Sequence, residues 1–417
     1  MEYLTRRIEK RLHSLCRQFP AIVVTGARQV GKTTLLQHAF PDVREFVVFD
    51  PGIDIGNARA DPDLFLNNRK TPLILDEIQY APELVGAIKR RIDKDRSPGQ
   101  YIMTGSQQWG VLKKMAESLA GRAVFLDLEG FCLAENSLGQ TTHTWLECWL
   151  TEPERLLSAR PRRLERSRSL FEQLWRGWLP ETHFLSIDVI PEFYTGYQRT
   201  YIERDARLIA DISDWQQFGR FFRLVSALTA QEINYSQIGR DIGLTPQTAR
   251  RWLDVLRSTY QWHDVHPWSG NPLKRVSGKP KGFITDTGIA CAALAISSPQ
   301  AIGDHPSWGA LFETAVAGEL RKMSYCLSPP PTIYHWRSHG GAEVDFILER
   351  DGRLFPVEVK ASTHPTRADA RGIHAFRKSH KNTRIEKGLV VAPAEEIVQL
   401  TEEDWVIPWD LSGVNDL

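Results

Sequence analysis

Cysteine is scarce in this chain of 417 residues, with five scattered cysteines, no Cys-x-x-Cys pair and no tight cluster of cysteine and histidine. This pattern argues against a zinc site and against the disulfide framework of a small secreted protein. The first ten residues are charged and lack the apolar segment of a signal peptide. No apolar run approaches the roughly 18 residues that a membrane-spanning helix needs. We therefore expect a protein of the reduced cytoplasm with no membrane contact.

The chain also lacks an excess of charge of either sign, because 52 Lys and Arg balance 51 Asp and Glu to a net charge of +1. No global field draws such a protein onto nucleic acid, so a nucleic-acid site would have to be local. Hydrophobic residues at 42% and charged residues at 25% are typical of a folded soluble protein. At roughly 150 residues per domain, the length predicts about three domains.

Strand-like apolar runs alternate with helical stretches in the first third of the chain, which predicts a parallel α/β sheet domain over residues 1–135. These runs are Ala21–Val24, Glu45–Phe49, Leu73–Leu75, Tyr101–Met103 and Ala123–Leu126. The remaining parts are expected to be a linker or insertion (136–170), a helical and winged-helix domain (171–290) and a mixed α/β domain (305–417).

The linker segment is rich in arginine. We interpret it as a solvated basic face in preference to a DNA contact. The arginines are Arg155, Arg160, Arg162, Arg163, Arg166 and Arg168.

Residues 26–33, GARQVGKT, match the phosphate-binding pattern G-x-x-x-x-G-K-[ST] between an expected strand and an expected helix. Gly26 and Gly31 allow backbone N–H groups to converge on phosphate oxygens at a helix N-terminus. Lys32 is expected to reach the β- and γ-phosphates, and the Thr33 hydroxyl to bind Mg²⁺. Thr34 completes the predicted nucleotide-binding set.

Two acids end the apolar run at 73–75. Asp76 is expected to hold the Mg²⁺ shell and Glu77 to act as general base on the attacking water. Ser106, after the run at 101–103, is a candidate for contact with the γ-phosphate or the water. Arg122 would stabilise developing charge within its own subunit or from a neighbour in a homo-oligomer, although a surface salt bridge is an equally good interpretation.

The motifs TGARQVGKTT, LILDE, TGSQQ and SLAGR, in this order, resemble prokaryotic AAA-type ATPases that carry a C-terminal domain of uncertain function. The resemblance continues through WRGWLP at 175–180 and YIERD at 201–205, and covers roughly residues 3–400. It implies a P-loop NTPase fold of the AAA type with ATP and Mg²⁺ as cofactors, and it implies ATP hydrolysis.

Residues 235–256 predict two short helices around a tight turn, with Ser236 capping the first and Thr245 the second. Gly243 supplies the turn. This is a helix-turn-helix pattern, interpreted as winged, that would present Gln247, Arg250 and Arg251 outward. The alternatives are DNA contact or a packing module that touches no nucleic acid. The expected buried face comprises Ile238, Ile242, Ala249, Leu253 and Leu256.

The stretch Glu343–Lys360 predicts a β-hairpin whose polar side carries Asp345, Glu358 and Lys360. Its D-x(n)-E-x-K pattern resembles restriction-endonuclease-like nucleases, which implies Mg²⁺ or Mn²⁺ bound by Asp345 and Glu358 and a water assisted by Lys360. Glu313, on an apolar helix, is the further acid of such a site. An exposed hairpin with Glu–Lys pairs is the alternative. His335 and the other nearby histidines are expected at the surface.

Together these patterns predict an ATPase that couples turnover to binding of DNA, including branched DNA, with metal-dependent DNA cleavage by the C-terminal domain as a further hypothesis. The alternative is a nucleotide-dependent switch whose C-terminal domain binds a partner without cleaving it.

Overall fold

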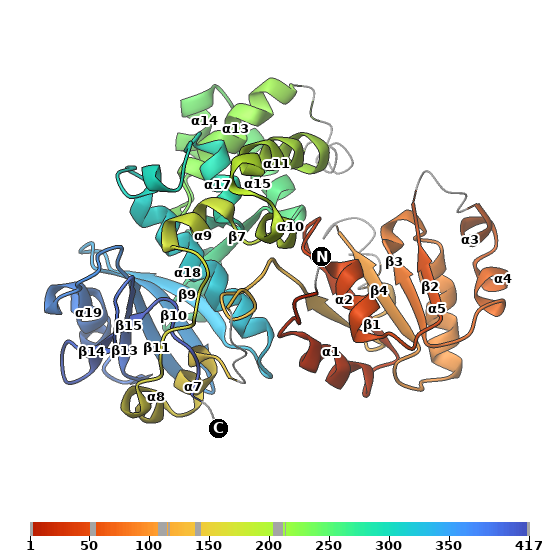
Figure 1. The fold of residues 1–417 in the computed structure, drawn as a ribbon, viewed down its shortest axis with the longest axis horizontal. Coiled ribbons are helices and arrows are strands. Elements are labelled where there is room, and N and C mark those ends of the chain that lie inside the picture. The colour runs from red at the N-terminus through yellow and green to blue at the C-terminus, as the bar shows by residue number, and fades with distance from the viewer. Residues whose placement is uncertain are drawn as a thin grey trace.

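A computed structural model describes residues 3–50, 56–106, 115, 117–137, 143–202, 212 and 214–414 of the chain (Figure 1). The YIERD motif lies outside the described side chains, as does the end of TGSQQ. No helix in the described ranges is long and apolar enough to cross a membrane.

The N-terminal part is a parallel five-stranded sheet in the order β2-β3-β4-β1-β5, which confirms the predicted parallel α/β domain. Each predicted apolar run coincides with one of its strands, except that Phe49 lies just beyond β2. The elements are α1 (Glu9–Cys16), β1 (Ala21–Thr25), α2 (Lys32–Ala39), β2 (Glu45–Val48), α3 (Gly56–Ala60), α4 (Pro62–Asn67), β3 (Leu73–Asp76), α5 (Leu84–Lys94), β4 (Tyr101–Gly105) and β5 (Ala123–Asp127).

The three central strands β3, β4 and β1 are buried along their whole length, because both faces of the sheet are covered there. In β1, Ile22 and Val24 point into a core shared with α1 and α2, whereas Ala21 and Val23 point into a second core with α5. The first core continues through the middle and C-terminal parts as far as Leu411. One continuous apolar interior therefore fixes the P-loop domain to the rest of the chain.

The middle part is mainly helical and includes the predicted helix-turn-helix. Gly243 ends the first helix with φ 72°, and Thr245 caps the second with its hydroxyl accepting from Thr248 N. Asn234, rather than Ser236, caps the first helix, because its side chain accepts from Gln237 N. The elements are α9 (Leu170–Arg176), α10 (Pro180–Phe184), α11 (Ile190–Tyr197), α13 (Trp215–Ala227), β6 (Gln231–Glu232), α14 (Tyr235–Ile242), α15 (Pro246–Ser258), β7 (Trp262–Pro267), α16 (Pro272–Ser277), β8 (Lys281–Ile284) and α17 (Thr287–Ala293).

The C-terminal part is built on a mixed sheet in the order β14-β15-β13-β11-β10-β9-β7-β8-β6, with β12 beside β11. Strands β7 and β9 pair in parallel, so the middle and C-terminal parts share this sheet. The predicted hairpin is present, with Asp351 and Gly352 at φ 53° and 70° in its turn. The elements are α18 (Trp308–Tyr325), β9 (Thr332–Arg337), β10 (Glu343–Arg350), β11 (Arg353–Val359), α19 (Arg371–Ser379), β12 (Arg384–Ile385), β13 (Gly388–Ala392), β14 (Val398–Gln399) and β15 (Asp404–Pro408).

The segment expected as a linker or insertion forms α7 (Trp145–Thr151) and α8 (Pro153–Ala159), which lie beside the C-terminal sheet in Figure 1. Trp149 packs edge-on against Phe355 of β11, with ring centroids 5.2 Å apart. Arg163 and Arg166 bind the buried Asp410 at 2.9 and 2.6 Å. The interpretation as a solvated basic face is wrong for these two arginines, because a buried carboxylate requires cationic partners.

Candidate nucleotide site and C-terminal carboxylate cluster

The predicted phosphate loop joins the end of β1 to the start of α2, and its backbone requires glycine at two positions. Gly26 has φ 150°, and a Cβ there would lie 2.0 Å from Leu128 O. Gly31, with φ 90°, precedes the first helical residue, Lys32. The N–H groups of the first helical turn have no partner within the helix, so the loop presents them to an anion together with the positive end of the helix dipole.

The ammonium of Lys32 is buried and lies over the loop itself, where Nζ donates to Gly26 O at 3.1 Å and to Ala27 O at 2.8 Å. A lysine held by neutral carbonyls is available to exchange them for a phosphate, which offers a full negative charge. Arg6, which lies before α1 in the chain, also holds the loop in place. Arg6 donates to Val30 O at 2.8 Å, and through its other terminal nitrogen to Glu129 O at 2.6 Å.

Thr33, in the first turn of α2, meets Asp76, the last residue of β3, as the sequence predicts. The Thr33 hydroxyl donates to Asp76 Oδ2 at 2.7 Å, and Thr104 donates to Oδ1 of the same carboxylate. Burial raises the pKa of Asp76, and the hydrogen bonds from the two threonines work against this rise. A hydroxyl and a carboxylate side by side next to a phosphate loop form an oxygen donor set of the kind that Mg²⁺ takes up together with nucleotide phosphates. These residues therefore fit the predicted Mg²⁺.

Glu77 follows Asp76 in a left-handed conformation, φ 57°, and its N–H donates to Thr104 Oγ1 at 2.9 Å. Ser106 Oγ donates to Glu77 Oε2 at 3.2 Å, and the Gln79 amide donates to the same oxygen. The structure thus brings the predicted base and Ser106 together. It also adds Gln79, which sequence reasoning missed. The only sequence signal for Gln79 was its place two residues after the acid pair.

Arg122 lies far from this group within its own chain. It directly precedes β5, whose first residue pairs with Ala21, the first residue of β1, whereas the phosphate loop follows the last residue of β1. Because the strands are parallel, Arg122 lies at the amino ends of the strands, and the phosphate loop lies at their carboxyl ends. Arg122 binds Asp93 there at 2.6 and 3.0 Å. A role within the same subunit does not fit this position. The contact with Asp93 is a surface salt bridge, as the alternative interpretation has it, and a contribution to a neighbouring subunit stays a prediction.

A cavity of about 330 Å³ opens beside the loop and is lined by Gly31, Lys32, Thr33, Thr34 and Glu77 together with residues from outside the sheet domain. The N-terminal segment contributes Tyr3, whose ring stacks on His38 of α2 at a centroid distance of 3.9 Å. Helix α10 contributes Pro180 and Phe184. These apolar and aromatic side chains, absent from the predicted set, give the cavity a surface suited to a nucleotide base.

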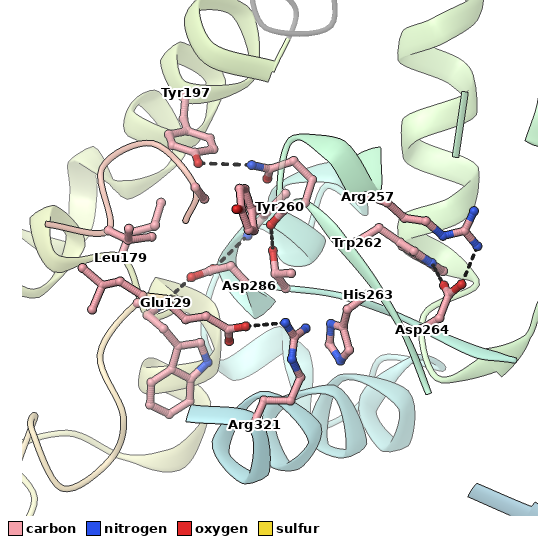
Figure 2. Close-up of a pocket in the computed structure, with 18 residues that line it drawn as sticks. Glu129, Leu179, Tyr197, Arg257, Tyr260, Trp262, His263, Asp264, Asp286 and Arg321 are labelled. Carbon is pink, nitrogen blue, oxygen red and sulfur yellow. Dashed lines mark hydrogen bonds and ion pairs between the residues drawn. The ribbon is translucent and has the colours of Figure 1, made fainter. Parts of the chain in front are cut away.

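Behind the loop a second cavity, of about 230 Å³, lies where the three parts of the chain meet (Figure 2). Arg321 of α18 points into it and binds Glu129 at 2.5 Å. On the same helix, Lys322 donates to Phe131 O at 2.9 Å and Glu319 accepts from Leu133 N at 3.1 Å. Helix α18 therefore holds the segment 129–133 that follows β5. Arg6 connects this segment to the phosphate loop, because it donates to both Glu129 O and Val30 O.

The other end of α18 carries Glu313, which the structure brings together with the rest of the predicted C-terminal set. Asp345 accepts from Val359 N at 2.9 Å, and Lys360 lies 3.2 Å from Glu358 Oε2. Sequence reasoning missed Lys281 of β8. Its Nζ lies 2.5 Å from Glu313 Oε1 and 3.1 Å from Asp345 Oδ1.

Burial and mutual repulsion set the charges of this cluster. Burial, followed by the neighbouring Asp345, raises the pKa of Glu313 to about 8 and that of Glu358 well above its usual range. Burial is the strongest influence on Asp345 and opposes its ionisation, but the ammonium of Lys281, the hydrogen bond with Glu358, the Lys360 ammonium and the Val359 N–H together lower the pKa of Asp345. Asp345 is thus the carboxylate held ionised, and the exposed-hairpin alternative does not apply because Asp345 and Glu358 are buried.

A divalent metal does not fit this cluster as it stands. Among the described residues, no group of three or more histidine, cysteine, aspartate or glutamate side chains is arranged to hold a metal ion. The physical reason is the ammonium of Lys281, which lies against the oxygens of Glu313 and Asp345 that a metal would need. His335, expected at the surface, is instead buried, with Nε2 3.1 Å from Lys279 O, and burial lowers its pKa to about 4.

Comparisons with known proteins divide the chain into the same three parts. Residues 18–137 match the family model of an AAA domain. Residues 167–300 and 308–411 match two domains of unknown function, DUF8612 and DUF4143. A restriction-endonuclease-like fold is not among the matched descriptions.

Among curated proteins, the uncharacterized protein Rv2008c of Mycobacterium tuberculosis is 26% identical over 406 residues, which cover 97% of this chain and 82% of that protein. The uncharacterized protein Mb2031c of Mycobacterium bovis gives the same values. Among solved structures, the Walker-type ATPase PABY2304 of Pyrococcus abyssi has a TM-score of 0.39 at 16% identity and covers 70% of this chain and 96% of that one. Likeness at this level carries no argument about activity.

Proposed function

We propose that this protein binds and hydrolyses ATP with Mg²⁺. The observation that carries the proposal is the contact between Thr33 and Asp76 beside the phosphate loop, with Glu77 lining the same cavity as Thr33. The loop and Lys32 would bind the phosphates, and Thr33 and Asp76 would hold the metal, which would supply positive charge beside the phosphates. Glu77 accepts a proton from the attacking water, and Ser106 and Gln79 orient its carboxylate.

Two substitutions test this assignment. Lys32→Ala is expected to abolish ATP binding, and Glu77→Gln to leave binding intact while turnover falls by about 10²- to 10⁴-fold, the usual contribution of a general base. Binding is measured by titration with a fluorescent ATP analogue and turnover by phosphate release. The matched controls are Lys70→Ala and Glu83→Gln, both exposed residues of the same domain. ATPase activity that is unchanged in both site variants would refute the proposal.

For the middle part of the chain we propose that α15 contacts DNA. Gln247, Arg250 and Arg251 are all exposed on this helix, while Ala249 and Leu253 are buried. This is the arrangement of a recognition helix whose apolar side packs on its own domain. The exposed arginines supply a local positive patch on a chain of net charge +1.

The test is whether DNA raises ATP turnover. Stimulation that falls with salt, and is lost in Arg250→Ala/Arg251→Ala while basal turnover persists, supports DNA contact. Indifference to linear, plasmid and branched DNA supports the alternative, a nucleotide-dependent switch whose C-terminal part binds another partner.

Of the two hypotheses for the C-terminal cluster, binding without cleavage is favoured, because an ammonium lies against the oxygens that a catalytic metal would need. We therefore expect no nicking of plasmid or branched DNA in Mg²⁺ or Mn²⁺, with or without ATP. Nicking that disappears in Asp345→Ala would establish a nuclease and contradict this conclusion.

A further inference from the structure

The cavity behind the phosphate loop in Figure 2 gathers several polar atoms that have no hydrogen-bond partner in the described part of the chain. They are both ring nitrogens of His263, the side-chain oxygen of Gln261 and Nη1 of Arg321, and all of them are buried. Unpaired buried polar atoms destabilise a fold, and native proteins rarely collect several of them in one place. Their position around one cavity indicates that a polar molecule completes them.

The charged groups around this cavity are already balanced. Arg321 binds Glu129 at 2.5 Å, and Arg257 binds Asp264 at 2.7 Å. The buried carboxylate of Asp286 accepts hydrogen bonds from a backbone N–H and a tyrosine hydroxyl. Among the lining residues that the structure describes, no charge is thus left over for an ion to pair with, so an uncharged ligand fits best.

The aromatic lining and the size of the cavity point to a planar ring. Trp178, Tyr197, Tyr260 and Trp262 all line it, and aromatic side chains offer flat surfaces against which a ring packs. The cavity volume of about 230 Å³ exceeds the roughly 150 Å³ of a protein cavity that holds one benzene molecule. It is smaller than the roughly 300 Å³ at which pockets for drug-sized ligands begin. One small ring system therefore fits.

The unpaired atoms require a ligand that both donates and accepts hydrogen bonds. Burial, followed by the nearby Arg321, lowers the pKa of His263 well below its usual range, so its ring is neutral at pH 7 and offers one N–H and one lone pair. Arg321 Nη1 can only donate, and Gln261 Oε1 can only accept. A heterocycle with a carbonyl or ring nitrogen beside an N–H supplies both kinds of group.

We propose that this cavity is a binding site for an uncharged planar heterocycle of the nucleobase class. Gln261, His263 and Arg321 supply its polar contacts, and Ala27 and Val30 of the phosphate loop form one wall. Within the described ranges, this cavity shares no lining residue with the cavity beside Lys32. The inference therefore does not rest on ATP binding.

The test is calorimetric titration of the nucleotide-free full chain with adenine, hypoxanthine, cytosine and uracil. At least one of these bases is expected to bind once per chain, whereas benzoate, a planar anion, is not. His263→Phe removes both ring nitrogens and preserves an aromatic ring against Phe283, and it should weaken binding at least tenfold, as should Gln261→Leu. The matched controls, Tyr3→Ala and Phe184→Ala, alter the other cavity and should leave affinity for the base unchanged.

Several results would overturn the proposal. If none of the four bases binds at millimolar concentration, water alone fills the cavity. If binding is unchanged in folded His263→Phe and Gln261→Leu proteins, the base binds elsewhere, and loss of binding in Tyr3→Ala or Phe184→Ala would place it in the nucleotide cavity. Benzoate that binds as tightly as the bases would contradict an uncharged ligand.

Discussion

Gly130 lies at the contact between the ATPase domain and the middle part, and its replacement by alanine should separate them. A Cβ on Gly130 would lie 2.4 Å from Trp178 O and 2.8 Å from Trp178 C, which are backbone atoms that no rotamer change can move. The same carbonyl accepts from Phe131 N at 2.7 Å, and Trp178 N donates to the buried Asp286 at 2.7 Å. The backbone at this contact is therefore held from both sides.

The cost of Gly130→Ala has two parts. Forcing a methyl group into a filled contact costs about 1–3 kcal/mol. Weakening the buried hydrogen bond to Trp178 adds about 1 kcal/mol. We expect the free energy of unfolding to fall by about 2–4 kcal/mol in total. Nucleotide affinity should fall as well, because Arg6 joins Gly130 O to Val30 O of the phosphate loop.

Urea unfolding followed by tryptophan fluorescence measures the first effect, and ATP titration measures the second. The matched control is Gly219→Ala, inside α13, where a Cβ meets no atom within 4 Å. That change should be neutral or raise stability by up to about 1 kcal/mol, because alanine favours a helix over glycine. A Gly130→Ala protein with an unfolding midpoint equal to that of the wild type would refute the reasoning.

Two further predictions concern buried carboxylates. Burial raises the pKa of Glu319 from 4.5 to about 7, so the folded chain holds this proton more tightly than the unfolded chain, and stability should fall by about 3 kcal/mol as pH rises from 4.5 through 7. Urea unfolding at pH 5 and pH 8 should show this loss, and Glu319→Gln should be free of it; a variant with the same pH dependence would contradict the assignment. Asp410→Asn should lower the midpoint by an amount equivalent to about 2 kcal/mol, less than a fully buried pair would cost, because Arg163 is 37% exposed and regains water. The control is Asp351→Asn at the exposed hairpin turn, and equal midpoints for the two variants would show that Asp410 is not a structural anchor.

The nucleotide site was predictable because its determinants are local. Residues 26–33 contain the loop, its glycines and the first helical turn in one stretch, and the acid pair at 76–77 ends an apolar strand. The phosphate loop follows β1 and Asp76 ends β3, and parallel strands have their carboxyl ends on the same side of the sheet. The order of these motifs along the chain was therefore enough to place Thr33 beside Asp76. The hairpin around Asp351 and Gly352 was predictable for the same reason.

Contacts between distant segments were not predictable. Arg122 directly precedes the parallel strand β5 and so lies at the end of the strands away from the phosphate loop, where it meets Asp93, although its motif follows the others in sequence. Arg163 and Arg166 lie in an arginine-rich segment whose composition is typical of a solvated surface. In the folded chain they bind Asp410, which lies almost 250 residues later in the sequence.

Local patterns in the sequence were enough to predict the parallel α/β domain, the phosphate loop with the pair Thr33 and Asp76, and the C-terminal hairpin with its three charged residues. The charges that those three residues meet follow from the packing of distant segments. Lys281 is 64 residues from Asp345 in the chain, and no local pattern marks it as the partner of that acid. A short-range motif specifies backbone geometry through neighbouring residues, whereas the electrostatic state of a buried cluster depends on every segment that packs around it.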